Sequence, residues 1–491
     1  MSWILRAATP LDALTPKDTV DLVIDGDIIV TVGQHLDESR YQPERIIDAH
    51  GKLLMPGLVN AHLHSHDRFD KGRFDRLPLE IWRSLYNPPQ ATRTWSSREC
   101  YLRTMLNGIE LLRGATTTVV DDVHHSAPLN EAAIEAVFQA YEDLGLRARV
   151  SAAYADRPFY SDIPYLEDLL PPDLKATSES GPTPDQALEL WRETARRHAR
   201  GRVQFALSPS AIDRCTPAFL ERTWEISEEY QLPVLVHVLE TRTQALAAEL
   251  FHGRTMIAHM ARSGLLTPRC VLVHCVWVTE ADIDLIADSR ACVVHNPGSN
   301  LKLGSGIAPV SRMLAAGIDV GLGTDNNNAN DAANMFEAMK LAALVSRTQG
   351  DDYESWVGAD QALAMATEGG CRCAQLPGHF GTLTPGAKAD FVLLRLSDLA
   401  FLPLNSALHQ LVFAECGHAV DTVVVDGVVV MAAGRIETVD EPALLAEITA
   451  ATPGIRDMIS RGEAVGKSLR PHLEQAFRLC RDDPANPFGR D

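Results

Sequence analysis

The chain has 491 residues, of which 46% are hydrophobic and 22% are charged, which is ordinary usage for a globular protein. This composition excludes a disordered or fibrous protein, and the length fits a barrel of about 250–400 residues with a smaller domain. The 45 lysines and arginines against 65 aspartates and glutamates give a net charge of −20. Because proteins that bind phosphate backbones or anionic membranes carry basic surfaces, we expect neither a nucleic-acid polymer nor a membrane as a partner.

Three features bear on the cellular compartment. The nine cysteines are scattered and form no CxxC pair, which is typical of reduced thiols in the cytosol. Residues 1–14 lack the basic-then-apolar order of a signal peptide. No apolar run approaches the length of about 18 residues that a membrane span needs. We therefore predict a cytoplasmic protein.

Short β-rich runs with glycine turns lie near both ends of the chain. Asp25-Gly26 is a typical hairpin turn, and Asp426-Gly427 repeats it near the other end. The runs cover residues 20–33, 45–54, 381–395 and 420–436. This distribution predicts one small β domain, assembled from residues 1–57 and 376–440.

The middle of the chain, residues 58–375, alternates short apolar runs with amphipathic helical patterns. The runs lie at 58–63, 115–120, 148–154, 203–207, 233–238, 270–275, 291–295 and 318–323, and the helical patterns include 97–113, 129–144, 184–200, 217–229 and 331–346. Eight strand–helix units favour an α/β fold with a (β/α)8 barrel of the TIM type. An open doubly wound sheet is the alternative, but no GxGxxG follows the early strands, which weakens a dinucleotide-binding version.

Two further segments lie outside these units. Residues 157–182 are rich in Pro, Asp and Ser and predict a long irregular insertion. Residues 441–491 predict a C-terminal helical tail, with helices over 441–449 and 466–481.

Metal-binding residue types fall at the ends of the predicted strands. His62 and His64 end the first strand, where residues two apart point to the same side. His237 ends the fifth strand, His274 ends the sixth, and Asp325 follows the eighth. Because barrel active sites are built at the carboxyl ends of the strands, this set predicts one site.

Three neutral imidazoles and one carboxylate suit Zn²⁺ or a similar divalent ion, and they leave room for a water. Such an ion lowers the pKa of its water to about 7. Glu240 lies three residues after His237, just past the strand end, and is the best candidate for the general acid/base. Asp325 is placed both to touch the metal and to accept the proton of the water.

These residues give the chain a resemblance to the amidohydrolase superfamily, within its branch of metal-dependent aminohydrolases. That branch includes methylthioadenosine/S-adenosylhomocysteine deaminases, guanine-type deaminases and triazine hydrolases. The matching motifs span nearly the whole chain: 55–64 (MPGLVNAHLH), 71–82 (KGRFDRLPLEIW), 114–118 (GATTT), 237–240 (HVLE), His274, 295–310 (HNPGSNLKLGSGIAPV), 323–325 (GTD), 366–375 (ATEGGCRCAQ) and 381–390 (GTLTPGAKAD).

The resemblance implies roles for these residues and a (β/α)8 barrel with a split β-sandwich. It implies that the metal is bound by His62, His64, His237 and Asp325. It makes Glu240 and His274 the proton shuttle and the partner of the water or oxyanion. Binuclear relatives bridge two metals with a lysine on the fourth strand, but the only lysine between residues 151 and 237 is Lys175, in the insertion. We therefore expect one divalent metal, Zn²⁺ before Fe²⁺ or Mn²⁺.

Several positions depart from the nucleoside-deaminase pattern. Lys71-Gly72 replaces the usual Arg-Gly, and residues 83–91 lack the carboxylate that holds a ribose. Pro209-Ser210 replaces a Pro-His pair, and the loop after Asp325 is rich in asparagine. These departures predict that a free aminated ring is turned over better than any adenosine derivative. The predicted substrate contacts are His66, Trp82, His125, Ser210, His295 and Asn326.

The leading hypothesis is hydrolytic deamination of an aminated nitrogen heterocycle of the purine, pterin, pyrimidine or triazine type. A metal-activated water attacks the carbon that bears the amine, and ammonia leaves. The alternative within the same chemistry is displacement of chloride or an alkylamine from a triazine-like ring. A non-catalytic protein of the same fold is a third possibility, against which stands the complete set of ligands. We expect a small-molecule heterocyclic substrate and a homo-oligomer, either a dimer or a tetramer.

Overall fold

The computed structural model describes residues 2–12, 18–88, 93–124, 130–175, 182–376 and 378–488. Its central feature is a series of parallel strands, one in each of the eight predicted apolar runs, followed by a short ninth strand: β6 (Leu58–His64), β7 (Thr116–His124), β8 (Arg147–Ala153), β9 (Val203–Ala206), β10 (Val234–Val238), β11 (Cys270–His274), β12 (Cys292–His295), β13 (Val320–Leu322) and β14 (Asp325–Asn326). The strands are almost entirely buried, as expected for parallel strands covered on both faces.

The order of these strands returns to its starting point. One sheet has the order β14-β6-β7-β8-β9, and a second has the order β10-β11-β12-β13. A parallel bridge between Leu207 and Val234 links the two sheets. At the other end, β14 follows β13 in the chain and pairs with β6, so that Asp325 lies beside Leu63. The carboxyl ends of β6, β10, β11 and β13 therefore lie around one opening.

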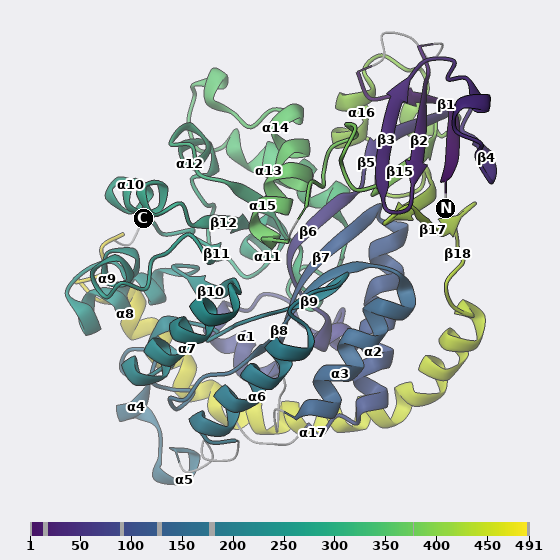
Figure 1. The fold of residues 1–491 in the computed structure, drawn as a ribbon. Helices are drawn as coiled ribbons and strands as arrows, with labels where there is room; N and C mark the ends of the chain where they lie inside the picture. Colours follow the sequence, from purple (N-terminus) through teal and green to yellow (C-terminus); the bar gives the residue numbers. More distant parts are fainter. Residues whose placement is uncertain are drawn as a thin grey trace.

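Helices connect these strands and surround them (Figure 1). The predicted helix over 97–113 matches α2 (Ser97–Arg113), because Ser96 and Glu99 form a capping box at its first turn and Gly114 follows its last residue. The other connecting helices are α3 (Glu131–Leu144), α6 (Pro184–Arg197), α7 (Pro217–Tyr230), α8 (Arg242–His252), α9 (Met256–Arg262), α10 (Glu280–Ser289), α11 (Pro297–Lys302), α12 (Val310–Ala315), α13 (Met335–Ser346), α14 (Ala359–Ala364) and α15 (Gly370–Ala374).

A second, mixed sheet is built from both ends of the chain and lies at one end of the molecule (Figure 1). Its order is β18-β17-β16-β15-β5-β1-β2-β3, and β4 pairs with β1. The two chain ends meet where β5 and β15 pair antiparallel, with Leu54 opposite Leu393. Strand β1 was not among the predicted runs. The strands are β1 (Ser2–Pro10), β2 (Val20–Asp25), β3 (Ile28–Gly33), β4 (Arg45–Asp48), β5 (Lys52–Pro56), β15 (Phe391–Arg395), β16 (Val420–Val425), β17 (Val428–Ala432) and β18 (Arg435–Ile436).

The C-terminal segment forms one helix, α17 (Glu441–Asp482), where the sequence predicted two. Pro453 and Pro471 both lie inside this helix. It packs against α1 (Leu79–Tyr86) near the parallel strands, and it continues past α8. At Gly466 the backbones of the two helices approach closely, because a Cβ there would lie 2.2 Å from the Ser84 carbonyl oxygen.

The insertion at 157–182 is not wholly irregular. Its described part contains the short helices α4 (Leu166–Leu169) and α5 (Pro172–Lys175), and α4 packs on α17. The remaining short helix is α16 (Ala407–Phe413), and single helical turns occur at η1 (Glu38–Arg40), η2 (Ser65–Asp70), η4 (Ile212–Arg214), η5 (Tyr353–Ser355), η6 (Met365–Gly369) and η7 (Leu399–Phe401). Among the residues that the structure describes, no helix combines the length and the apolar character needed to cross a bilayer.

Candidate active site

The polar residues at the strand ends converge on one point. The Nε2 atoms of His62 and His64, both on β6, lie 3.2 Å apart, and Nε2 of His237 on β10 lies 3.4 Å from that of His64. The Asp325 carboxylate completes the group, with Oδ1 at 3.2 Å from His64 Nε2 and 3.6 Å from His62 Nε2. His274 on β11 adjoins it, with its ring centroid 5.6 Å from that of His237.

Backbone carbonyls orient two of these imidazoles. His64 Nδ1 lies 2.5 Å from the carbonyl oxygen of Asp122, and His237 Nδ1 lies 2.9 Å from that of Ser210. Because a carbonyl oxygen only accepts, each Nδ1 carries a hydrogen, so that in the neutral ring, the form that binds a metal, Nε2 holds a lone pair. The two lone pairs point into the same space. Such second contacts are typical of histidines that bind metals.

This arrangement fits a divalent cation. Ligand atoms of His62, His64 and Asp325 all lie within 4.8 Å of one another, as do those of His62, His237 and His274. Asp325 Oδ1 is buried, and no hydrogen-bond donor of the described residues reaches it. Burial lowers the pKa of His64, but the Asp325 carboxylate outweighs that effect and raises the pKa to about 9. A positive charge is thus favoured at this point, and the N₃O donor set suits Zn²⁺.

Glu240 and His274 face each other beside the cluster. Glu240 Oε2 lies 3.5 Å from His274 Nε2, and Glu240 Oε1 accepts a hydrogen bond of 3.4 Å from Ser305 Oγ. Burial raises the pKa of Glu240 well above its usual range, and the Asp325 and Glu80 carboxylates raise it further. Burial lowers the pKa of His274. Glu240 therefore favours its protonated form and His274 its neutral form.

The backbone is strained where these residues leave their strands. Ser210, Leu239, His274 and Asp325 have φ angles of +62°, +50°, +77° and +58°, respectively. Residues other than glycine rarely adopt positive φ, and such strain gathers at active sites. These turns let consecutive side chains at a strand end project into the same opening.

Two of the predicted substrate residues adjoin the cluster. The His66 ring centroid lies 5.3 Å from that of His64, and its Nδ1 accepts a hydrogen bond from the His124 backbone N–H at 3.2 Å. Ser210 contacts the cluster through its carbonyl oxygen, and its Oγ accepts a hydrogen bond of 2.8 Å from Arg214.

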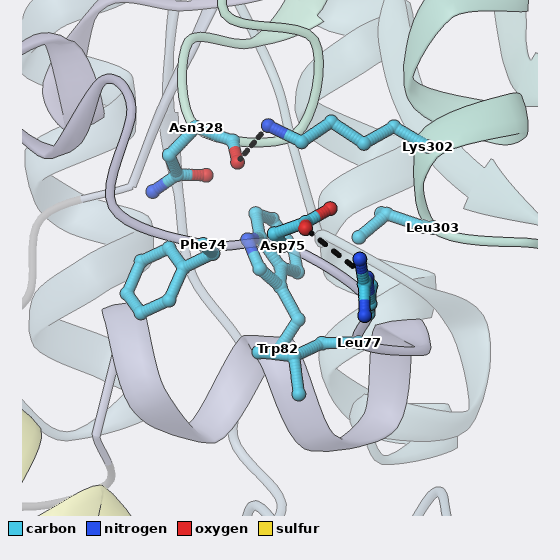
Figure 2. Close-up of a pocket in the computed structure, with 8 residues that line it drawn as sticks. Phe74, Asp75, Leu77, Trp82, Lys302, Leu303 and Asn328 are labelled. Carbon is cyan, nitrogen blue, oxygen red and sulfur yellow. Dashed lines mark hydrogen bonds and ion pairs between the residues drawn. The ribbon is translucent and has the colours of Figure 1, made fainter.

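The other predicted contacts differ in their surroundings. Trp82 lines a shallow pocket together with Phe74, Lys302 and Asn328 (Figure 2). His295 is buried at the end of β12, where burial and the nearby His274 lower its pKa to about 3. Asn326 Nδ2 donates to Asp67 Oδ2 at 2.9 Å, so this amide hydrogen is used within the protein. His125 lies outside the described residues.

The sequence interpretation missed one acidic residue of the site. Asp122 on β7 forms a second group of closely spaced ligand atoms with His64, His124 and His237. Its Oδ2 lies 3.6 Å from His124 Nε2 and 3.8 Å from His237 Nδ1. The spacing of Asp122 and His124 repeats that of His62 and His64, and this repetition was the signal available in the sequence.

The amidohydrolase family model matches residues 53–430. The chain belongs to the amidohydrolase family. The resemblance inferred from the motifs is thereby confirmed, and with it the expectation of a hydrolase. Zinc-bound neighbours and the His/Asp cluster together support a divalent metal in this member of the family.

Several similar relatives are named as deaminases. The chain is 35% identical over 450 residues to a 5-methylthioadenosine/S-adenosylhomocysteine deaminase of Desulforudis audaxviator, covering 91% of this chain and 97% of the relative. It is 32% identical over 416 residues to a 5'-deoxyadenosine deaminase of Methanothermobacter thermautotrophicus, covering 83% of this chain and 89% of the relative.

Solved structures share the fold. An adenosine deaminase from Xanthomonas campestris with bound zinc aligns with a TM-score of 0.80 at 28% identity, covering 94% of this chain and 98% of that one. A triazine hydrolase from Arthrobacter aurescens aligns with a TM-score of 0.82 at 24% identity, covering 92% and 99%. At that identity the second likeness concerns the fold alone.

Proposed function

We propose that the protein is a metal-dependent deaminase that hydrolyses the amine of an adenine-type ring carried by a nucleoside. The observation that carries the proposal is the convergence of His62, His64, His237 and Asp325 beside Glu240 and His274. The names of the relatives, which refer to adenosine derivatives, support this ring over a triazine.

In this proposal His62, His64, His237 and Asp325 hold one divalent cation, and Zn²⁺ is the first choice. A cation bound there lowers the pKa of its water toward 7 and polarises the reacting group. The carbonyl oxygens of Asp122 and Ser210 keep two ligand nitrogens aimed at the cation. Lys175, the only lysine between residues 151 and 237, lies in α5, away from the strand ends, which supports a single ion.

The remaining residues move protons. Glu240 enters the reaction protonated and donates to a ring nitrogen, which makes the amine-bearing carbon more electrophilic. Asp325 accepts a proton from the attacking water. His274, whose Nδ1–H donates to Asn300 Oδ1 at 2.9 Å, presents Nε2 as an acceptor toward the developing hydroxyl group. Water adds one oxygen to the ring carbon, and the amine leaves as ammonia.

We propose the following domains for the chain. Residues 58–375 form a (β/α)8 barrel, residues 1–57 and 376–440 together form a β-sandwich, and residues 441–491 form a C-terminal helical segment. The return of β14 to β6 supports the closed barrel, and the pairing of β5 with β15 supports the composite domain.

The choice of a nucleoside over a free base is supported by the names of the relatives, which refer to adenosine derivatives. Residues 83–91 do lack a carboxylate, but Asp162 of the insertion lies against Arg83, and the buried Glu80 accepts a hydrogen bond from Thr241. His66 and Ser210 are retained as substrate contacts.

A panel assay tests the proposal. The zinc-loaded enzyme is given adenosine, 5'-deoxyadenosine, methylthioadenosine, S-adenosylhomocysteine, adenine, guanine, a pterin and a chlorotriazine, and ammonia, alkylamine and chloride are measured separately. We expect ammonia from the nucleosides, with kcat/KM at least about 10-fold above that of any free base. A free base that outperformed every nucleoside would support the free-ring prediction, and release of chloride would favour triazine hydrolysis.

A further inference from the structure

An arginine whose neighbouring carboxylate is engaged by a second arginine lies beside the site. Arg214 ends η4, the turn that follows β9, and its side chain is 20% exposed. Its Nη1 donates to Ser210 Oγ at 2.8 Å. The nearest carboxylate oxygen is Oδ2 of Asp162, 4.0 Å from Arg214 Nε. Among the described residues, no carboxylate lies within hydrogen-bond distance of this guanidinium.

Asp162 does not neutralise Arg214, because it is already paired. Arg83 Nη1 donates to Asp162 Oδ2 at 2.6 Å, and Arg83 Nη2 donates to Oδ1 at 2.9 Å. This is the bidentate geometry of a strong arginine–carboxylate pair. The three side chains together carry one net positive charge. Burial and the like charge of Arg83 lower the pKa of Arg214, and Asp162 offsets only part of that effect. A bound anion would stabilise the charged guanidinium.

Arg214 and Ser210 together leave hydrogen-bond donors available next to the site. Since Arg214 donates to Ser210 Oγ, the hydroxyl hydrogen of Ser210 is left to donate elsewhere. The other guanidinium N–H groups of Arg214 have no partner among the described residues. The Ser210 carbonyl oxygen accepts from His237 Nδ1, which places this pair of donors next to the proposed metal ligands.

We propose that Arg214 and Ser210 form an oxyanion-binding subsite that receives a negatively charged group of the substrate, remote from the reacting ring. This inference rests on the proposed deaminase function and narrows its substrate class to nucleosides that carry such a group. A carboxylate and a phosphate share the required chemistry, because both present planar or forked oxygens to an arginine.

Paired substrates that differ in charge test the subsite. One pair is S-adenosylhomocysteine and its carboxyl methyl ester, and the other is adenosine 5'-monophosphate and adenosine. For wild type we expect the anionic member of one pair to have the higher kcat/KM. In Arg214→Gln that advantage should fall roughly 10- to 100-fold, the value of one or two hydrogen bonds to a charged group. Arg214→Lys, which keeps the charge, should restore part of it.

Arg157→Gln is the matched control. Arg157 is exposed on the neighbouring turn and donates to the Asp213 carbonyl oxygen at 3.2 Å, without contact to Ser210. The Arg157→Gln substitution also removes one positive charge, and it should leave the preference for the anionic substrate unchanged. The pair that shows the effect identifies the anion as carboxylate or phosphate.

Two results would overturn the subsite. One is a wild-type enzyme that deaminates neutral and anionic nucleosides equally well. The other is an Arg214→Gln variant in which kcat/KM falls to the same extent for both members of each pair, which would indicate a structural role for Arg214. Failure of the deaminase function itself is distinct, because no nucleoside would then release ammonia from the wild-type enzyme.

Discussion

Asp325 and Glu240 show how one buried pocket gives two carboxylic acids opposite properties. Asp325 lies against the imidazoles of His62 and His64, and although burial opposes it, the closeness of these two rings keeps the pKa of its carboxyl well below the usual range. Glu240 lacks such a cationic partner, and burial raises its pKa. Two carboxyl groups whose pKa values are driven apart are a common basis for separate acid and base roles.

Substitution of Glu240 separates metal binding from proton transfer. Glu240→Gln is nearly isosteric and removes only the transferable proton. We expect bound zinc to stay near one equivalent while turnover falls by roughly 10²-fold or more. Metal analysis and ammonia release on the same preparation measure both quantities.

Glu249→Gln on the exposed face of α8 is the control and should match wild type. If Glu240→Gln lost its zinc, Glu240 would be a ligand, and the assignment of the general acid would be wrong.

At the residue scale, the sequence predicts the candidate site residues whose positions depend on their spacing along a strand or on where a strand ends. His62 and His64 lie two apart on one strand, and the strand-end positions of His237, His274 and Asp325 follow from the alternation of strands and helices. Arg214 could not be predicted, because its significance depends on Asp162 being engaged by Arg83, a pairing between distant segments. Asn326 shows the same limit, since its amide is taken up by Asp67.

At the scale of elements, α1 lies between the site and the C-terminal helix α17. Helix α1 carries Trp82 and Arg83, and α17 packs directly on it. The sequence predicted a break within the helical tail, where the structure has a continuous helix through Pro453 and Pro471. Proline disfavours a helix interior locally, but packing against the body of the protein overrides that preference.

The glycine at the contact of α1 and α17 gives a test at this scale. A Cβ at Gly466 would lie 2.2 Å from the Ser84 carbonyl oxygen and 2.9 Å from Leu85 Cα, so Gly466→Ala must push the two helices apart. We expect a loss of roughly 1–3 kcal/mol in the free energy of unfolding, together with reduced kcat/KM. Chemical denaturation and the ammonia assay measure these effects.

Gly454→Ala in the same helix is the matched control. No atom lies within 4 Å of the position of its Cβ, so the substitution should stabilise the helix by about 0.5–1 kcal/mol. Equal behaviour of the two variants would contradict the close contact of α1 with α17.

At the scale of the whole molecule, an ion-pair cluster joins the parallel strands to the mixed sheet. Arg147 on β8 donates through Nε to Asp390 Oδ2 at 3.0 Å and also contacts Asp426, which lies in the turn between β16 and β17. The side chains of Arg147 and Asp390 are only 6% and 2% exposed. The β-rich character of both chain ends was predictable, but this connection depends on tertiary contacts that no local pattern reveals.

Removal of the Arg147 side chain should lower the free energy of unfolding of the protein. Arg147→Met leaves two carboxylates without their cation, and we expect a loss of roughly 3–5 kcal/mol in unfolding free energy. Burial already raises the pKa of Asp390, and Arg147 opposes that rise. Without Arg147 the folded state binds more protons than the unfolded state, so the variant should lose stability as pH rises above the ordinary aspartate pKa of about 3.9.

Arg197→Met, which breaks an exposed pair with Glu131, is the comparison and should change stability by less than about 1 kcal/mol. A pH-independent effect of Arg147→Met would contradict the role given to the cluster.

The most direct test of the account is ammonia release from 5'-deoxyadenosine as zinc is returned to metal-depleted enzyme. We expect no ammonia release without metal. The rate of release should rise in proportion to the added Zn²⁺ and reach a plateau at one equivalent per chain. His237→Ala, which removes a ligand, should give no comparable rise. Turnover by the metal-free protein, or full activity of His237→Ala, would contradict the metal-dependent mechanism.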